Sequence, residues 1–316
     1  MGLTLLYIKL VLTAVFWGGT FIAGRVVSSQ TDPVTATFLR FAMASAALVF
    51  LARRREGLLP RLTRRQAVLI LVLGLSGVVF YNLFFFGGLK TVPAGRASVI
   101  VAANPIFIFL GSVLFFRESF TRLRAAGIAL SFAGAALVIG RGRPLAVFQG
   151  GVGWGEFLIL GCVASWVVYS LVGKVIMQDV LPRTAVTGAC LVGAAGLLAP
   201  ALLQTGPAGL VRLSGSAWLG LAYLSFFGTA LGFSWYYDGI RVLGPSRAAV
   251  FINLVPISAV VLAWLLLGET LDASLAAGAV LVVLGVYLIN RSAERPFLRR
   301  RPVPPRPETA RPGPGR

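Results

Sequence analysis

The sequence predicts an all-α membrane protein of ten transmembrane helices in two inverted five-helix repeats. Three observations support this fold class. First, the 316 residues are 57% hydrophobic and only 12% charged, whereas a soluble domain carries about 25% charged residues. Second, the apolar residues fall in runs of roughly 18 to 24, the length that a helix needs to cross about 30 Å of hydrocarbon. Third, the chain repeats itself at a nearly constant spacing.

The repeat is clearest in two segments that lie 151 residues apart. Arg96, Pro105 and Glu118 of the first segment recur as Arg247, Pro256 and Glu269. Arg, Pro and Glu are scarce in a chain dominated by Leu, Ala, Val and Gly, so their shared register is not a product of composition. An internal duplication of this kind decides the fold before any single helix is considered.

Ten helices are expected, joined by loops too short to hold a soluble domain. They cover 4–25, 34–52, 66–89, 95–116, 122–140, 153–174, 184–203, 216–239, 246–267 and 273–290. The first repeat therefore spans 4–140 and the second 153–290.

The first helix also fits a cleaved signal peptide, because it is apolar, carries Lys9 and ends in small residues. The repeat argues against cleavage. Trp17 and Gly24 recur 149 residues later as Trp166 and Gly173. The first helix is therefore the expected partner of the sixth and should be retained.

Basic residues predict the orientation. The loop 53–65 and the segment 291–316 are rich in Arg, and cytoplasmic loops carry such an excess. Both termini are therefore predicted to be cytoplasmic. Because five helices are an odd number, the second repeat must be inserted upside down relative to the first. Such repeats recur in transporters, with the substrate site near the midplane between the halves. The Arg/Pro-rich segment 291–316 is predicted to be a disordered tail drawn to the anionic inner leaflet.

Composition also excludes several functions. The chain has no histidine, which removes most metal, acyl-transfer and general-base chemistry, so we expect no cofactor, no metal and no catalytic residue. Cys162 and Cys190 lie within apolar runs and are interpreted as small packing residues. The net charge of +19 is placed in membrane-flanking segments, so no nucleic-acid partner is expected.

Aromatic and hydroxyl side chains share helix faces in both repeats. Trp17, Thr20 and Phe21 lie on one face, and Trp166, Tyr169 and Ser170 repeat that face. Ordinary helix packing is one interpretation. A cavity for an amphipathic organic molecule is the one we favour, because hydroxyls are hard to place against lipid. The candidate substrate-binding residues are Trp17, Thr20, Phe21, Arg40, Tyr81, Asn82, Phe85, Asn104, Trp166, Tyr169, Ser170, Trp235 and Asn253.

Two prolines and a stripe of small residues invite two interpretations each. Pro105 and Pro256 fall inside predicted helices, where each either bends the helix for packing or forms a hinge. Gly127, Ser131 and Ala135 predict a close helix contact, within the protomer or in a homodimer.

The glutamates that end the same predicted helices as the prolines have a structural interpretation. Glu118 and Glu269 are each followed three residues later by a good helix N-cap, Thr121 and Asp272. Both glutamates are expected near exposed helix-start amides, where they fix the turn.

The charged residues of the predicted helices lie near helix ends, and the deepest of them is basic. No acidic residue lies deep in a predicted helix, so a proton relay at the midplane is not expected. Arg40 is the deepest charge. It either extends outward or pairs with Asp32, or it attracts the carboxylate of an amino-acid-like substrate. Transport is accordingly expected to run as facilitated diffusion or exchange, or to couple to protons only through residues near helix ends such as Glu156 and Asp238.

Several blocks of the chain match a known pattern: Trp17 to Phe21, Phe38 to Phe41, Arg96 to Pro105 with its repeat Arg247 to Pro256, and Glu118 to Gly127 with its repeat Glu269 to Gly278. Over about residues 4 to 290 the chain resembles the EamA-like branch of the bacterial drug/metabolite transporter superfamily. The resemblance implies a transporter rather than an enzyme, similar to exporters of amino acids, nucleosides, drugs and other metabolites. The halves differ where Arg40 aligns with Ala189.

These observations predict a plasma-membrane exporter of small amphipathic metabolites such as amino acids, working by alternating access through a central cavity. An importer or exchanger of sugars, nucleosides or drugs is the alternative within the same class. A structural membrane subunit is the alternative from another class. Polar and aromatic residues in both halves argue against a passive subunit, which needs no polar midplane.

Overall fold

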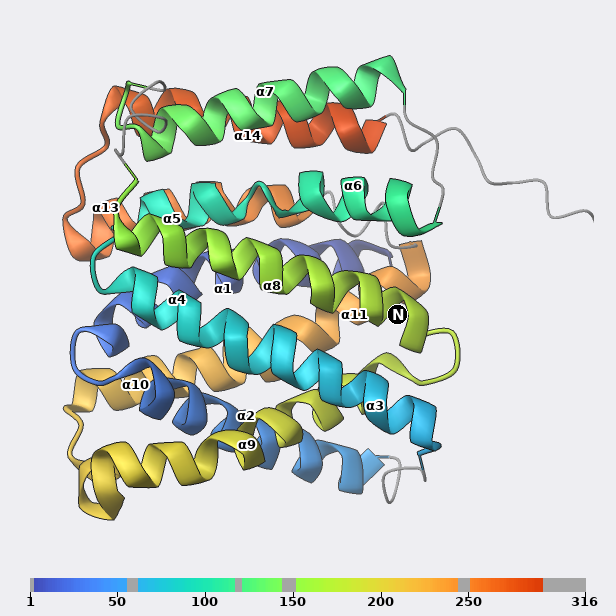
Figure 1. Ribbon diagram of the computed structural model, residues 1–316, viewed down its shortest axis with the longest axis vertical. Helices are drawn as coiled ribbons and strands as arrows, with labels where there is room; N and C mark the ends of the chain where they lie inside the picture. Colours follow the sequence, from blue (N-terminus) through green and yellow to red (C-terminus); the bar gives the residue numbers. More distant parts are fainter. Residues whose placement is uncertain (1–2, 56–61, 117–120, 144–151, 244–250, 292–316) are drawn as a thin grey trace, which may run out of the picture.

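The computed structural model describes residues 3–55, 62–116, 121–143, 152–243 and 251–291 (Figure 1). Within these ranges the chain is helical and contains no strand. The first half comprises α1 (Leu3–Ser28), α2 (Pro33–Arg55), α3 (Arg64–Leu73), the π-helical η1 (Gly74–Phe80), α4 (Tyr81–Leu89), α5 (Ala94–Val101), α6 (Asn104–Phe116) and α7 (Arg122–Ile139). The second half comprises α8 (Trp154–Ile176), α9 (Pro182–Val211), α10 (Gly215–Tyr223), the π-helical η3 (Leu224–Leu231), α11 (Gly232–Leu243), the 3-10 helix η4 (Phe251–Asn253), α13 (Leu254–Leu267) and α14 (Ala273–Arg291).

The described helices account for the ten predicted crossings. Eight helical stretches are long and apolar enough to span a membrane, and two shorter apolar helices cover 254–267 and 273–285. The segments α3, η1 and α4 form one crossing, as do α5 with α6 and α10, η3 with α11. The all-α membrane fold is confirmed.

Equivalent helices of the two halves make equivalent contacts with the opposite half. Helix α1 packs against α13 and against α10, η3 and α11. Its counterpart α8 packs in the same way against α5 and α6 and against α3, η1 and α4. Helices α2 and α9 pair with each other, and α7 pairs with α14. The two pairs lie at opposite ends of the bundle in Figure 1. A two-fold relation between the halves produces these equivalent contacts.

Glycines show the same relation at the level of single residues. A Cβ added to Gly88 would lie 2.5 Å from Cδ1 of Ile159, and one added to Gly239 would lie 2.6 Å from Cδ2 of Leu10. Gly88 and Gly239 are 151 residues apart, and Leu10 and Ile159 are 149 apart. The helix contact between α4 and α8 is thus repeated between α11 and α1.

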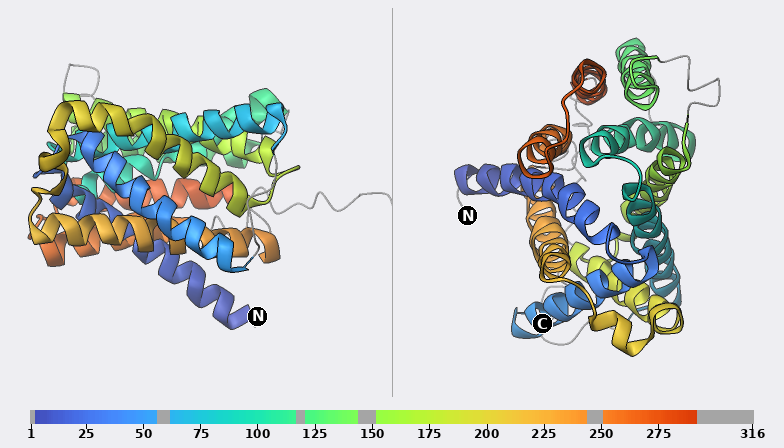
Figure 2. Two further views of the ribbon diagram at one scale, coloured as in Figure 1. Left: turned by 90° about the horizontal axis from the view of Figure 1, so that it is seen from below. Right: turned by 90° about the vertical axis from the view of Figure 1, so that its left-hand side faces the viewer.

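The small-residue stripe of α7 packs within the protomer. A Cβ on Gly285 in α14 would overlap the carbonyl oxygen of Gly127. The Ser131 hydroxyl donates a hydrogen bond to the Val282 carbonyl oxygen at 3.3 Å. Figure 2 shows α7 and α14 together at one edge of the bundle. A homodimer stays a prediction.

Several boundaries differ from those expected. The predicted helix 95–116 is divided, because α5 ends at Val101 and α6 begins at Asn104. The predicted helix 184–203 extends to Val211, with a break at Gly206, whose φ of 69° favours glycine. Both π-helical segments interrupt helices that were expected to be regular. The predicted tail beyond residue 291 lies outside the described residues.

Candidate functional site

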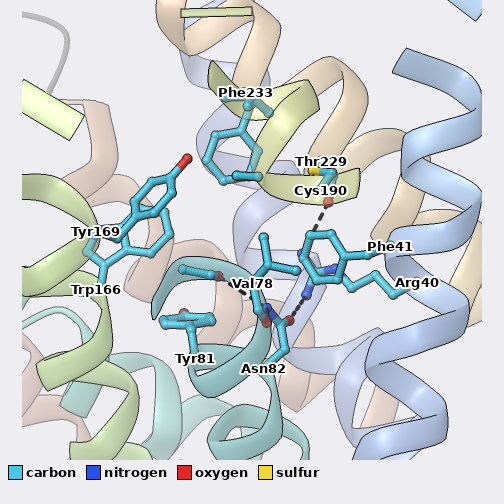
Figure 3. Close-up of a pocket in the computed structure, with 13 residues that line it drawn as sticks. Arg40, Phe41, Val78, Tyr81, Asn82, Trp166, Tyr169, Cys190, Thr229 and Phe233 are labelled. Carbon is cyan, nitrogen blue, oxygen red and sulfur yellow. Dashed lines mark hydrogen bonds between the residues drawn. The ribbon is translucent and has the colours of Figure 1, made fainter. Parts of the chain in front are cut away.

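A small cavity of about 30 Å³ lies between the two halves. Its volume has room for about two water molecules. It is enclosed by α2, η1 and α4 of the first half and by α8, α9, η3 and α11 of the second. The lining residues are Arg40, Phe41, Gly77, Val78, Tyr81, Asn82, Trp166, Tyr169, Val186, Ala189, Cys190, Thr229 and Phe233 (Figure 3).

Arg40 supplies the positive charge of this cavity. Its side chain is only 7% exposed. Nη1 donates a hydrogen bond to Oδ1 of Asn82 at 2.8 Å, and Nη2 donates to Oγ1 of Thr229 at 3.4 Å. The guanidinium carbon lies 5.1 Å from the centre of the Phe41 ring, while Nε has no hydrogen-bond partner. Asn82 belongs to the first half and Thr229 to the second, so Arg40 bridges the halves.

The π-helical segments explain why both partners of Arg40 act as acceptors. A π-helix interrupts the regular hydrogen-bond ladder, and Nδ2 of Asn82 donates to the carbonyls of Gly77 at 3.4 Å and Val78 at 2.8 Å. The Thr229 hydroxyl likewise donates to the Leu224 carbonyl at 3.0 Å. Because the Asn82 amide and the Thr229 hydroxyl already donate to backbone carbonyls, their oxygens are left to accept hydrogen bonds. Both oxygens accept from the Arg40 guanidinium.

Aromatic rings form the wall opposite Arg40. Trp166 stacks on Tyr169 with ring centroids 5.0 Å apart, and Tyr81 lies 5.3 Å from Trp166. Phe233 completes the group, 6.2 Å from Trp166. Figure 3 shows the Trp166–Tyr169 pair across the cavity from Arg40 and Phe41. These groups match the chemistry of a molecule with one anionic end and a flat apolar body, which needs a wider cavity than the about 30 Å³ of this conformation.

Five of the predicted site residues line the cavity: Arg40, Tyr81, Asn82, Trp166 and Tyr169. Two more lie directly behind it. The Trp17 ring is 5.5 Å from Phe233, and its Nε1 donates to the Gly228 carbonyl at 3.0 Å. The Thr20 hydroxyl donates to the Trp17 carbonyl at 2.6 Å. That hydroxyl is satisfied by its own helix and does not need a cavity.

The other predicted site residues do not line this cavity. Phe21 and Phe85 are 3% and 1% exposed and meet edge to face in the packed core. The Ser170 hydroxyl donates to the Trp166 carbonyl of its own helix. Trp235 contacts the Phe16 ring, with Nζ of Lys9 5.8 Å from its centre.

Two asparagines complete the predicted set. Asn104 is buried at the start of α6, and its Oδ1 has no partner. Asn253 ends η4, and its side chain is outside the described part of the chain. A binding role for the thirteen residues stays a prediction.

The cavity also contains residues that the sequence reasoning missed, and several are repeat equivalents of predicted ones. Ala189 is equivalent to Arg40 at the offset of 149, and Phe233 to Asn82 at the offset of 151. Cys190 is equivalent to Phe41, and Thr229 to Val78. The cavity is therefore lined by both members of these four pairs, whereas Trp166 lines it without its equivalent Trp17. Applying the repeat offsets to each predicted residue would have found Ala189 and Phe233.

Both candidate hinge prolines follow interruptions in their helices. Pro105 is the second residue of α6, directly after the break at 102–103. Pro256 is the third residue of α13, directly after η4. Proline has no backbone N–H to donate, so the first turn of a helix tolerates it. A hinge at these positions stays a prediction.

Glu269 lies in the second half, but its side chain binds the start of α5 in the first half rather than the turn in which Glu269 itself lies. Its carboxylate accepts hydrogen bonds from the amides of Ala94, at 2.8 Å, and Gly95, at 3.1 Å, at the start of α5. Beside it, Nη2 of Arg96 lies 2.5 Å from Oδ2 of Asp272. Hydrogen bonds from Ser274 and the Leu275 amide, with the Arg96 charge, lower the pKa of Asp272 despite partial desolvation. Glu118 lies outside the described residues.

Asp32 does not pair with Arg40. Its Oδ1 accepts hydrogen bonds from the amides of Val34 and Thr35, both at 2.9 Å, at the start of α2. Its Oδ2 accepts one from the hydroxyl of Thr205 in α9 at 3.1 Å. Arg40 thus remains without a carboxylate partner among the described residues.

Comparison with known proteins identifies the family. Residues 4–140 and 153–291 match the EamA-like transporter family. An uncharacterized transporter, YyaM of Bacillus subtilis (strain 168), is 28% identical over 281 residues, which cover 89% of this chain and 92% of the relative. A probable amino-acid metabolite efflux pump of Salmonella typhimurium (strain LT2) is 30% identical over 290 residues, 88% of this chain and 92% of the relative. A solved structure titled only as the crystal structure of a protein has a TM-score of 0.66 at 22% identity, covering 93% of this chain and 99% of that one. That structure shares the fold, and by its two matched segments the chain belongs to the EamA-like transporter family.

Proposed function

We propose that this protein exports small amphipathic metabolites, foremost amino acids and their derivatives, across a bacterial plasma membrane. The observation that carries the proposal is the buried Arg40 in an aromatic-lined cavity between the two halves. Arg40 bonds to Asn82 in its own half and to Thr229 in the other. A movement of one half against the other would therefore change the groups around the bound molecule, as alternating access requires.

The chemistry of the cavity supports an amphipathic substrate. A guanidinium presents a planar fork of donors that matches a carboxylate. Tyr81, Trp166 and Tyr169 offer flat apolar faces to the rest of the molecule. The name of the Salmonella typhimurium relative, a probable amino-acid metabolite efflux pump, favours the same class of substrate.

The name of the Salmonella typhimurium relative, an efflux pump, supports export rather than import, and the predicted orientation supports placement in the plasma membrane. The excess of Arg in 53–65 and 291–316 supports cytoplasmic termini and contact with an anionic inner leaflet. The alternatives are import or exchange of sugars, nucleosides or drugs, and a structural subunit without transport.

A comparison of culture media tests the proposal. Three strains would be compared: one without the protein, one producing the wild type and one producing Arg40→Gln. We expect at least one amphipathic carboxylate to rise severalfold outside the cells with the wild type only. Accumulation inside the cells would favour import. Unchanged profiles in all three strains, with the protein present in the membrane, would favour the structural subunit.

A further inference from the structure

Among the described residues, the cavity carries one fixed positive charge and no negative one. Arg40 is the only charged residue of the described part of the chain that lines it. The titratable groups that face it from the neighbouring elements are the phenols of Tyr81 and Tyr169 and the thiol of Cys190, which are ordinarily neutral at pH 7. The cavity therefore has a net charge of +1 until an anion enters it.

The guanidinium is incompletely bonded in this state. Nε is buried and has no partner, and the contact of Nη2 with Thr229 is long, at 3.4 Å. A carboxylate binds an arginine through two parallel N–H···O bonds. The groups free to make such a pair on Arg40 are Nε and the weakly bonded Nη2. A buried charge without a partner is unfavourable, so a carboxylate would supply both the missing bonds and the missing charge.

From these contacts we infer that the substrate is a carboxylate of net charge −1, and that its export is electrogenic and driven by the membrane potential. This inference rests on the proposed transport function. An ammonium group on the substrate would find aromatic rings, which attract a cation, but no carboxylate among the described lining residues to neutralise its charge. A molecule whose amine is absent or acylated therefore fits better than a zwitterion.

Charge balance then determines the energy source. The loaded cavity is neutral, and none of its described lining residues is an acidic group that could carry a proton or a metal cation back. Asp238 is 3.7 Å from Lys9, and Glu156 lies in the first turn of α8. Neither acidic residue lines the cavity. Each cycle therefore moves one net negative charge outward. An inside-negative potential of about 100 mV sustains roughly a 50-fold outward gradient of a monoanion.

Proteoliposomes test the inference with three probes that share one ring and differ in charge. The probes are N-acetyl-L-phenylalanine, a monoanion, L-phenylalanine, a zwitterion, and L-phenylalaninamide, a cation. A potassium gradient with valinomycin sets an inside-positive potential of about 100 mV. We expect the wild type to accumulate the monoanion inside, approaching roughly 50-fold, above protein-free liposomes. The zwitterion should not accumulate, and a pH gradient alone should not drive the monoanion.

Three variants distinguish a loss of the Arg40 charge from a loss of folded protein. Arg40→Gln should abolish accumulation of the monoanion. Arg40→Lys retains the charge without the planar fork, so it should remain potential-driven with a rate lowered roughly tenfold. Arg25→Gln is the matched control. Arg25 lies near the end of α1, donates hydrogen bonds to the Leu89 and Val92 carbonyls, and does not line the cavity. This variant's accumulation of the monoanion in response to the potential should match that of the wild type. The wild-type measurement stands even where Arg40→Gln does not fold.

The outcomes distinguish this inference from the proposed function. Equal handling of monoanion and zwitterion, protein-dependent accumulation driven by pH alone, or full activity of folded Arg40→Gln would overturn the inference and leave transport intact. If none of the three probes is transported, thermal unfolding in detergent tests whether the protein binds a carboxylate at all. Stabilisation of the wild type but not of Arg40→Gln by N-acetyl-L-phenylalanine would support carboxylate binding and count against transport. Absence of both flux and stabilisation would overturn the inference, while the culture media still decide on export.

Discussion

The indole nitrogen of Trp17 donates a hydrogen bond to the backbone carbonyl of Gly228 at 3.0 Å. The bond connects the first helix of one half to the π-helical segment η3 of the other half. Within such a segment the regular backbone ladder is interrupted, and a side-chain donor stabilises a carbonyl there. Trp166, the repeat equivalent of Trp17, instead packs its ring on Tyr81 and Tyr169. The two tryptophans therefore have different roles.

Trp17→Phe should destabilise the protein more than Trp166→Phe. The first variant removes the bond to Gly228 and leaves a buried carbonyl short of a donor, at a cost of about 1–2 kcal/mol in the free energy of unfolding. The second variant keeps an aromatic ring and should alter substrate preference instead. Thermal unfolding in detergent, followed by flux in liposomes, measures both effects. Equal losses of stability would show that the indole bond contributes little.

Gly77→Ala should disturb the cavity through packing. An added Cβ would overlap the ring of Tyr169, and a ring cannot yield as a flexible chain end does. We expect a loss of about 1–3 kcal/mol in unfolding free energy and reduced transport. Gly196→Ala in α9 is the matched control, because nothing lies within 4 Å of its added Cβ. It should be neutral or stabilise by up to about 1 kcal/mol. A stable and active Gly77→Ala would mean that the ring of Tyr169 shifts to make room for the added methyl group.

The sequence predicted the arrangement of helices better than the membership of the site. The offsets of 149 and 151 identify which helices are equivalent, because duplicated packing needs duplicated small residues such as Gly88 and Gly239. Helix periodicity shows that Phe21 and Thr20 share a helix region with Trp17, but it does not distinguish a core from a cavity. The π-helical segments were missed because their glycines, Gly74, Gly77 and Gly228, do not differ from the many glycines that lie in regular helices of this chain. Those segments are what direct Asn82 and Thr229 at Arg40.

Glu269→Gln should loosen the start of α5. The carboxylate accepts both the Ala94 and the Gly95 amide, whereas a glutamine offers one acceptor oxygen and no charge to the helix N-terminus. We expect hydrogen exchange at 94–97 to accelerate about tenfold, the equivalent of roughly 1.4 kcal/mol. Glu156→Gln, in the first turn of α8, is the control and should leave that exchange unchanged. Unaltered protection in Glu269→Gln would assign the stability of α5 to packing alone.

Asp32 should make stability depend on pH only under acidic conditions. Burial favours the protonated form, but hydrogen bonds from Thr35, Thr205 and the Val34 amide outweigh it and lower the pKa below the ordinary 3.8. A carboxyl whose pKa is lower in the folded than in the unfolded protein stabilises the fold fully when the pH is above its unfolded-state pKa. That stabilisation is lost as the pH falls through its folded-state pKa. The stability difference between wild type and Asp32→Ala, about 1 kcal/mol for a helix N-cap, should therefore be constant from pH 5 to 8 and shrink below about pH 3.8. Unfolding midpoints between pH 3 and 8 measure it, and Thr205→Val, which removes one donor, should shift the acid limb to higher pH. A difference that changes between pH 5 and 8 would show that another group titrates with the fold.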